Sequence, residues 1–150
     1  MPSTAELTDV AVYVFRASLV GLRGVTRKLA VREDETLEDV HHLLQLAFDW
    51  DDDHLYAFWL SGKFWSRDAG PRFGRPGFCE EVGERNACVR LDRLGLEVGQ
   101  TVAYVFDFGD EWRVRLKLLE IRPPGVTPIP PILDSRGDAP PQYWHDEEVA

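Results

Sequence analysis

Two long runs of strand-forming residues lie close together in the second half of the sequence, and they constrain the fold more than any other feature. Residues 101–108 and 111–121 are rich in Val, Leu, Tyr and Phe, and only Gly109 and Asp110 separate them. This spacing predicts an antiparallel hairpin with a two-residue loop. A mostly antiparallel sheet is therefore the expected centre of the fold.

The loop length decides which side chains share a face of this hairpin. With a two-residue loop, Val105 lies opposite Val114, and both side chains face the core. The other face then carries three rings and three cations: Tyr104, Phe106, Phe108, Arg113, Arg115 and Lys117. Rings stack on planar bases and cations bind anions, so this face is a candidate ligand-binding surface for a nucleotide or a single-stranded nucleic acid. The alternative is that the helix or the C-terminal segment covers the rings, with the Arg and Lys stems lying over them.

The first fifty residues predict a second hairpin followed by one helix. Residues 10–19 and 27–32 are typical of two strands, joined by a glycine-containing turn. Residues 36–50 have the pattern of an amphipathic helix, with Thr36 as the N-cap and acidic side chains in the first turn. We expect the apolar face to consist of Leu37, Val40, Leu43, Leu44, Ala47 and Phe48, and the opposite face to contain Glu38, His42, Gln45 and Asp49.

The remaining segments complete a single domain. Residues 54–60 predict a strand with residues 63–65 as its hairpin partner, and the Gly-, Pro- and Arg-rich residues 66–78 predict a mobile loop. A short helical turn is expected within residues 89–96.

Seven of the ten prolines lie between Pro123 and Pro141, so we expect residues 123–150 to be extended, without regular strand, and to wrap the domain. The expected fold is then one α+β domain, residues 1–122, with a mostly antiparallel sheet, one main amphipathic helix packed on it and a proline-rich C-terminal wrap.

Composition limits the classes of function. The 150 residues contain 17 Lys and Arg against 26 Asp and Glu, a net charge of −9 that disfavours binding to bulk duplex DNA. Cys79 and Cys88 form no Cys-x-x-Cys pair, so neither a zinc ribbon nor a thioredoxin-like redox site is expected. No apolar run approaches the roughly 20 residues of a membrane span, and the N-terminus lacks a signal-peptide pattern. We therefore expect a cytoplasmic monomer or homodimer with reduced thiols and no cofactor.

Three blocks of the sequence resemble the plasmid pRiA4b ORF-3-like family. They are residues 36–50 (TLEDVHHLLQLAFDW), residues 54–58 (HLYAF) and residues 104–112 (YVFDFGDEW). The resemblance extends over most of the chain, although residues 26–27 and 140–143 depart from the family's usual pattern. It implies a compact, mostly antiparallel α+β domain of the kind found in bacterial, archaeal and plasmid-borne proteins. It does not imply an activity, a cofactor or a catalytic residue.

Two histidines beside aspartates are the candidate acid–base and metal-ligating residues. An imidazole next to a carboxylate can move a proton near neutral pH or bind a divalent ion. The candidate catalytic set is His41, Asp53, His54, Asp107 and Asp110, and the candidate metal ligands are His41, Asp53 and His54. The alternative is structural: the imidazoles fix the helix-to-strand turn, and the aspartates at the hairpin tip form its turn.

The sequence favours a binding or interaction module that recognises a protein or a small-molecule ligand. Its resemblance suggests a link with plasmid or mobile-element biology. A small enzyme or metal-binding protein that uses the His/Asp cluster is one alternative, and a single-stranded nucleic-acid or nucleotide binder is the other. A deep pocket with converging polar groups would favour the enzyme, whereas an exposed aromatic patch would favour the binder.

Overall fold

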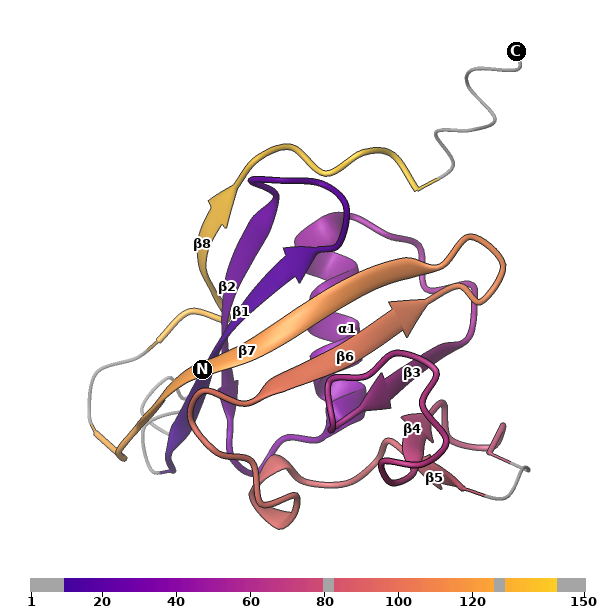
Figure 1. The fold of residues 1–150 in the computed structure, drawn as a ribbon. Coiled ribbons are helices and arrows are strands. Elements are labelled where there is room, and N and C mark those ends of the chain that lie inside the picture. The colour runs from indigo at the N-terminus through magenta and orange to yellow at the C-terminus, as the bar shows by residue number, and fades with distance from the viewer. Residues whose placement is uncertain (1–9, 80–82, 126–128, 143–150) are drawn as a thin grey trace.

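The computed structural model describes residues 10–79, 83–125 and 129–142, which form an eight-stranded sheet with one α-helix against one face (Figure 1). The strand order is β5-β4-β3-β6-β7-β1-β2-β8, and all neighbouring strands are antiparallel except β4 and β5. The elements are β1 (Val12–Leu19), β2 (Thr26–Arg32), α1 (Leu37–Phe48), β3 (Tyr56–Trp59), β4 (Arg72–Gly74), β5 (Glu84–Asn86), the 3₁₀ helix η2 (Leu91–Arg93), β6 (Thr101–Phe106), β7 (Trp112–Arg122) and β8 (Ile132–Arg136). The α+β class with a mostly antiparallel sheet is confirmed.

The predicted N-terminal hairpin is confirmed. β1 and β2 pair without interruption from Val12 opposite Arg32 to Ser18 opposite Thr26, and β1 also pairs with β7 on its other side. β1 and β7 are therefore central strands. The predicted helical turn within residues 89–96 is present as η2.

Helix α1 begins at a complete capping box. The Thr36 side chain accepts a hydrogen bond from the Asp39 amide at 3.2 Å, and the Asp39 carboxylate accepts one from the Thr36 amide at 2.9 Å. Two of the amides at the helix start that have no partner within the helix are thereby paired. The helix ends at Phe48, and its C-cap Asp49 has a left-handed backbone that turns the chain out of the helix.

Replacing Thr36 with alanine is expected to lower the free energy of unfolding by about 1 kcal/mol, because the Asp39 amide loses its acceptor. Urea denaturation followed by circular dichroism measures this change. Thr36→Ser keeps the hydroxyl and should stay close to the original protein. Equal losses in the two variants would mean that the methyl group, and not the cap, contributes the stability.

The buried stripe of α1 differs from the predicted one. The buried residues are Leu37, Val40, His41, Leu44, Gln45 and Phe48, at the i, i+3, i+4, i+7, i+8 and i+11 spacing of a helix that packs on one side. The prediction that Gln45 is exposed is wrong, since only 6% of it is accessible. Leu43 and Ala47, which were expected in the core, are only partly buried. Two polar side chains thus lie where apolar ones were expected.

The partner of β3 also differs from the prediction. β3 pairs with β4 and with β6, so residues 63–65 do not form its hairpin. Phe64 and Trp65 pack instead on the outer face of the sheet, against a buried cluster that includes Trp59 and Val105. Short strands β4 and β5 lie in and after the segment that was predicted to be a loop. The aromatic rings are therefore accommodated by packing on the sheet and not by strand pairing.

The C-terminal segment contributes a strand to the sheet. β8 pairs with β2 from Thr26 opposite Arg136 to Leu29 opposite Ile132. The prediction that residues 123–150 contain no regular strand is therefore wrong. Edge strands tolerate nearby prolines because one side of the strand has no hydrogen-bonding neighbour. The last part of this segment, residues 143–150, lies outside the described residues.

The register of the β6–β7 hairpin differs from the predicted one by one residue. Val105 lies opposite Arg113, and the loop contains five residues, 107–111. Asp107 and Glu111 adopt left-handed φ angles of 65° and 53°, and the Glu111 amide donates to the Asp107 carbonyl. These two residues, together with the Gly109–Asp110 turn between them, close the hairpin. The predicted two-residue loop is wrong.

A shift of one residue moves alternate side chains to opposite faces. Tyr104 and Phe106 lie in the core beneath α1, together with Val114. Arg113, Arg115 and Lys117 belong to the other face of the sheet. The expected alternation of Tyr104 and Phe106 with these cations is therefore not present.

None of the helices in residues 10–79, 83–125 and 129–142 is both long and apolar enough to span a membrane.

Candidate functional site

A chain of buried polar side chains connects the core to the surface beneath α1. Tyr104 is fully buried on β6, and its hydroxyl oxygen lies 2.7 Å from His41 Nδ1 and 3.1 Å from Gln45 Nε2. Burial raises the pKa of the Tyr104 hydroxyl well above its ordinary value, so the hydroxyl keeps its proton. Gln45 donates to the hydroxyl, and the hydroxyl donates to His41.

His41 extends this chain to a surface carboxylate. Its Nε2 atom lies 2.8 Å from Asp52 Oδ1, and a carboxylate only accepts, so Nε2 carries the proton. The ring stacks on Tyr56 with centroids 3.6 Å apart and planes inclined by 10°. Burial lowers the pKa of His41 to about 4, and the Asp52 carboxylate opposes this effect only in part. His41 is therefore neutral at physiological pH.

Asp52 contacts a second imidazole. His42 Nδ1 lies 3.4 Å from Asp52 Oδ2, and 56% of the His42 side chain is exposed. One ligand atom each from His41, His42 and Asp52 lie within 4.8 Å of one another, and these residues form the one group of three or more possible metal ligands found in the described part of the chain. We call these three residues the His41 cluster.

The other predicted acid–base residues form a separate group, which we call the His54 cluster. His54 Nε2 lies 3.5 Å from Asp53 Oδ1 and 3.5 Å from Asp107 Oδ2. The second oxygen of Asp107 accepts hydrogen bonds from the amides of Gly109 and Asp110, as in a hairpin-tip turn. Asp110 itself is exposed in the loop.

The Phe106 ring lies near both clusters, with its centroid 6.1 Å from that of His41 and 6.0 Å from that of His54. The candidate catalytic set is thus divided, because His41 pairs with Asp52 and not with Asp53. Sequence reasoning missed Asp52, His42 and Gln45 as members of the site. One signal was present: Gln45 follows His41 by four residues, which places both on one side of a helix.

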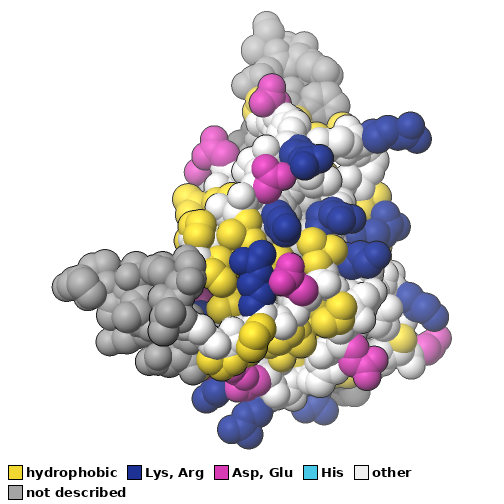
Figure 2. All heavy atoms as spheres, turned by 90° about the vertical axis from the view of Figure 1, so that its left-hand side faces the viewer, with side chains coloured by type: hydrophobic (Ala, Val, Ile, Leu, Met, Phe, Trp, Pro, Cys, Tyr) yellow, Lys and Arg dark blue, Asp and Glu magenta, His cyan; other side chains and the backbone are white. Residues whose placement is uncertain are grey.

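The outer face of the sheet, opposite α1, carries a group of cations from three neighbouring strands. We call it the cationic face, and it consists of Arg16 on β1, Lys28 on β2, and Arg113, Arg115 and Lys117 on β7. Strand register brings these side chains together, since Arg16 lies opposite both Lys28 and Lys117. Figure 2 shows Lys and Arg side chains next to one another, beside a hydrophobic patch, on the side of the molecule where β8 and β2 lie.

Aromatic rings border the cationic face. Phe64, Trp65 and Phe108 are partly buried and pack on the apolar cluster around Trp59. The guanidinium carbons of Arg113 and Arg115 lie 5.1 and 5.6 Å from the Phe64 ring centroid, within the range of a cation–π contact. Of the six residues predicted to bind a ligand, Phe108, Arg113, Arg115 and Lys117 therefore lie on or beside one face, whereas Tyr104 and Phe106 do not.

An open hollow of about 480 Å³ continues the cationic face toward the β1–β2 turn. Its lining includes the hydroxyl-bearing Ser18 and Thr26, and the cations Arg23 and Arg115. In proteins, hydroxyl and guanidinium groups commonly donate hydrogen bonds to phosphate oxygens. This hollow is thus suited to an anionic group.

Similarity to known proteins agrees with this fold. The family described as "Plasmid pRiA4b ORF-3-like protein" matches residues 11–145. Uncharacterized protein y4hQ of Sinorhizobium fredii (strain NBRC 101917 / NGR234) is 34% identical over 122 residues, which are 79% of this chain and 58% of that protein. The chain thus spans less than two thirds of the length of this relative.

A solved structure has the same fold. The crystal structure of MM3350, a protein of unknown function from Methanosarcina mazei Go1, superposes with a TM-score of 0.74 at 24% identity and covers 93% of this chain and 79% of that one. The resemblance seen in the three sequence blocks is confirmed by the match over residues 11–145. The chain belongs to the plasmid pRiA4b ORF-3-like family.

Proposed function

We propose that the protein is a binding module for single-stranded nucleic acid and that the cationic face is its binding surface. The observation that carries this proposal is the segregation of charge: a chain with a net charge of −9 places five cations of three neighbouring strands on one face of its sheet. Nucleic-acid affinity comes largely from cations that neutralise the phosphates they contact. The acidic side chains elsewhere on the protein therefore weaken its long-range attraction to nucleic acid but do not prevent contact at this face.

The side chains on this face can bind both parts of a nucleotide. Arg16, Arg115 and Lys117 are exposed and can reach phosphates. The partly exposed rings of Phe64, Trp65 and Phe108 offer surfaces on which a base can stack. Acids lie at its margins as well, among them Glu111, which pairs with Arg113 at 2.7 Å, and Asp134, which lies opposite Lys28. The three exposed cations are therefore the residues whose removal should matter most.

The test measures binding of labelled single-stranded oligonucleotides by fluorescence anisotropy over a range of salt concentrations. Replacing Arg16, Arg115 and Lys117 together with alanine should weaken binding more than tenfold. The slope of log K against log salt should decrease by about 2, since each phosphate contact on a single strand contributes about 0.7. Phe64→Leu should weaken binding by about 1–3 kcal/mol if a base stacks on this ring.

The matched control replaces three exposed arginines outside β1, β2 and β7 with alanine, namely Arg85, Arg90 and Arg93. It changes the net charge by the same amount and should leave affinity within about twofold. Equal losses in the two triple variants would show that only total charge matters and would contradict the proposal. Absence of oligonucleotide binding at low salt would contradict the proposal as well. If mononucleotides bind and oligonucleotides do not, the ligand is a nucleotide and not a single strand.

The C-terminal segment is, in this proposal, a wrap that closes the domain and not a ligand for a partner's groove. The pairing of β8 with β2 supports this, and so does Gln142, which donates to the Asp51 carbonyl at 3.2 Å and to Asp53 Oδ1 at 3.0 Å. We further infer a cytoplasmic monomer or homodimer with a role in plasmid or mobile-element biology. The plasmid named in the family description supports the latter part.

A further inference from the structure

The His41 cluster has the donor atoms and the spacing of a divalent-ion site. Zn²⁺ binds imidazole nitrogens at about 2.0–2.1 Å and carboxylate oxygens at about 2.0–2.2 Å, so tetrahedral ligand atoms lie about 3.3 Å apart. The distances from Asp52 to His41 Nε2 and to His42 Nδ1 are 2.8 and 3.4 Å. An ion would replace the protons that these contacts now share, with only small movements of the side chains.

The exposed members of the cluster can make those movements. His42 and Asp52 have side chains that are 56% and 35% exposed, whereas the His41 side chain is 1% exposed and fixed by its stack on Tyr56. The site is thus half preformed, with one rigid ligand and two adjustable ones. Its position at the surface leaves a coordination position open to water.

A second observation comes from the core side of His41. When an ion occupies Nε2, the imidazole must carry its proton on Nδ1 and donate it to the Tyr104 oxygen. Ligating histidines nearly always have such a partner for the other ring nitrogen. Tyr104 then needs an acceptor for its own proton, and Gln45 Oε1 is a buried oxygen with no hydrogen-bond partner.

Gln45 is 94% buried, and rotation of its amide would bring that oxygen to the Tyr104 hydroxyl. The Gln45–Tyr104 pair can therefore support either tautomer of His41. A His–Asp pair with a purely structural role would need only one tautomer of the imidazole. The hydrogen-bond chain from Gln45 through Tyr104 to His41 can run in either direction, and this property distinguishes an ion site from a pair that only fixes a turn.

We propose that His41 Nε2, His42 Nδ1 and the Asp52 carboxylate bind a divalent transition-metal ion of the Zn²⁺ class. Two imidazoles and one carboxylate are a set that zinc accepts with a water in the remaining position, and harder ions such as Mg²⁺ prefer all-oxygen sets. The proposal is independent of the cationic face, which lies on the opposite side of the sheet.

The experiment uses tag-free protein stripped with a chelator. Isothermal titration with ZnCl₂ should give one ion per chain, and Co²⁺ should give the visible absorption of a site with nitrogen and oxygen ligands. His42→Ala, at a half-exposed position, should weaken Zn²⁺ binding at least tenfold. Asp52→Asn keeps the shape of the side chain and a hydrogen-bond acceptor for His41 but removes the charge, so it should weaken binding as well.

His54→Ala is the matched control, because His54 also lies between carboxylates but belongs to the other cluster. It should leave Zn²⁺ affinity within about twofold. Circular dichroism of each variant separates loss of a ligand from loss of the fold. The proposal is overturned if the stripped protein takes up no stoichiometric Zn²⁺, or if His54→Ala abolishes binding while His42→Ala does not.

Discussion

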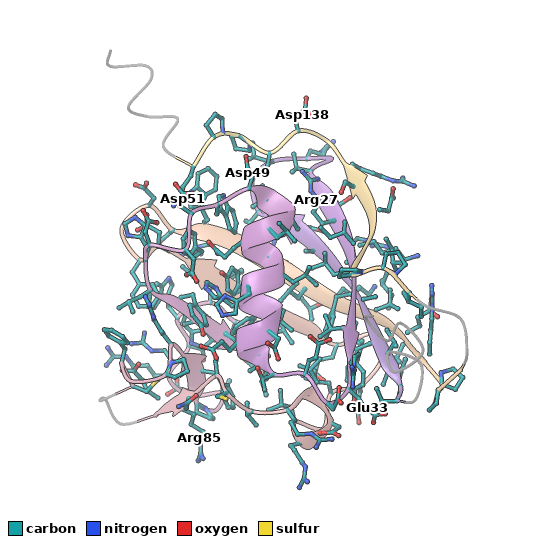
Figure 3. The ribbon with its side chains drawn as sticks, turned by 180° about the vertical axis from the view of Figure 1, so that it is seen from behind. Arg27, Glu33, Asp49, Asp51, Arg85 and Asp138 are labelled. Atoms are coloured by element: carbon teal, nitrogen blue, oxygen red, sulfur yellow. The ribbon has the colours of Figure 1, made fainter. Side chains whose placement is uncertain are left out.

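Replacing Arg27 with methionine is expected to lower the free energy of unfolding by about 3 kcal/mol. Arg27 lies on β2 and is only 7% exposed, and its guanidinium carbon lies 5.1 Å from the Phe48 ring centroid. Its hydrogen bonds go to four backbone carbonyls, those of Ala47 at 2.9 Å, Thr26 at 2.8 Å, Arg136 at 2.8 Å and Gly137 at 3.0 Å. Figure 3 shows Arg27 near the end of α1, beside Asp49 and Asp138.

The physical reason for so large an effect is the number of acceptors that depend on one side chain. The Ala47 carbonyl belongs to the last turn of α1, where carbonyls lack helical partners. Arg136 is the last residue of β8 and Gly137 follows it, so one guanidinium joins the helix, β2 and the C-terminal segment. Hydrogen bonds to a charged group contribute about 1.5–3 kcal/mol each, and water would replace some of them.

Urea denaturation at pH 7 measures the change, with Lys28→Met as the matched control. Lys28 is the next residue on β2 but is half-buried on the opposite face, so its replacement should change stability by about 0.5 kcal/mol or less. Arg27→Lys keeps the charge but not the fork of donors, and its loss should be intermediate. A loss below about 1 kcal/mol in Arg27→Met would show that these carbonyls are satisfied without the guanidinium.

Arg27 also illustrates what the sequence allows one to predict. Alternation in β2 places it on the same face as Leu29 and Val31, which are buried in the core. The pattern therefore indicated a buried position. The reason that a charged group is stable there was not visible, because its acceptors on Arg136 and Gly137 are more than a hundred residues away.

Helix α1 and the β1–β2 hairpin, which depend on local signals, were predicted correctly. Helix α1 has its cap and its acidic first turn within four residues of Thr36, and the β1–β2 hairpin has its turn glycines between the strands. These signals act at short range, so a single sequence contains them. The family could also be recognised, because the blocks that carry it are continuous.

The candidate site was predicted only in part, because register and burial depend on distant contacts. Gly109 and Asp110 indicated a two-residue loop, but Asp107 donates its amide to the Leu55 carbonyl and begins the loop two residues earlier. That single difference moves Tyr104 from the expected binding face into the core. There its hydroxyl forms hydrogen bonds with His41 and Gln45. These hydrogen bonds explain why the buried stripe of α1 contains two polar residues.

Acidification is expected to destabilise the metal-free protein through His41. Its pKa is about 4 in the folded protein, compared with 6.5 for an ordinary histidine. Well above pH 6.5 the imidazole is neutral in both the folded and the unfolded state, and its contribution to stability is complete. As the pH falls from 6.5 to about 4, the unfolded chain takes up a proton that the folded protein excludes, so this residue alone costs about 3 kcal/mol of stability.

The groups around His41 explain why it cannot simply take up this proton. The charged form of the imidazole would be buried against Tyr56 and Tyr104. Its Nδ1 atom would carry a proton and could no longer accept the hydrogen bond that the Tyr104 hydroxyl now donates. The Asp52 carboxylate favours the charged form, whereas His42 and Arg75 oppose it. Burial is the largest of these effects, and the carboxylate is half-exposed, so it cannot compensate.

The measurement compares urea denaturation between pH 7 and pH 4.5 for the chelator-treated protein and for His41→Gln, whose side chain does not titrate. Carboxylates titrate in both proteins, so the difference between the two pH profiles isolates the imidazole. Stability should fall more steeply with acid in the original protein, and His42→Gln, at an exposed position, should keep that steep profile. An NMR titration gives a second reading that needs no variant, because His41 should remain neutral at pH 5. Parallel profiles for His41→Gln and the original protein, or a His41 that titrates near 6.5, would show that the ring is not held neutral by burial.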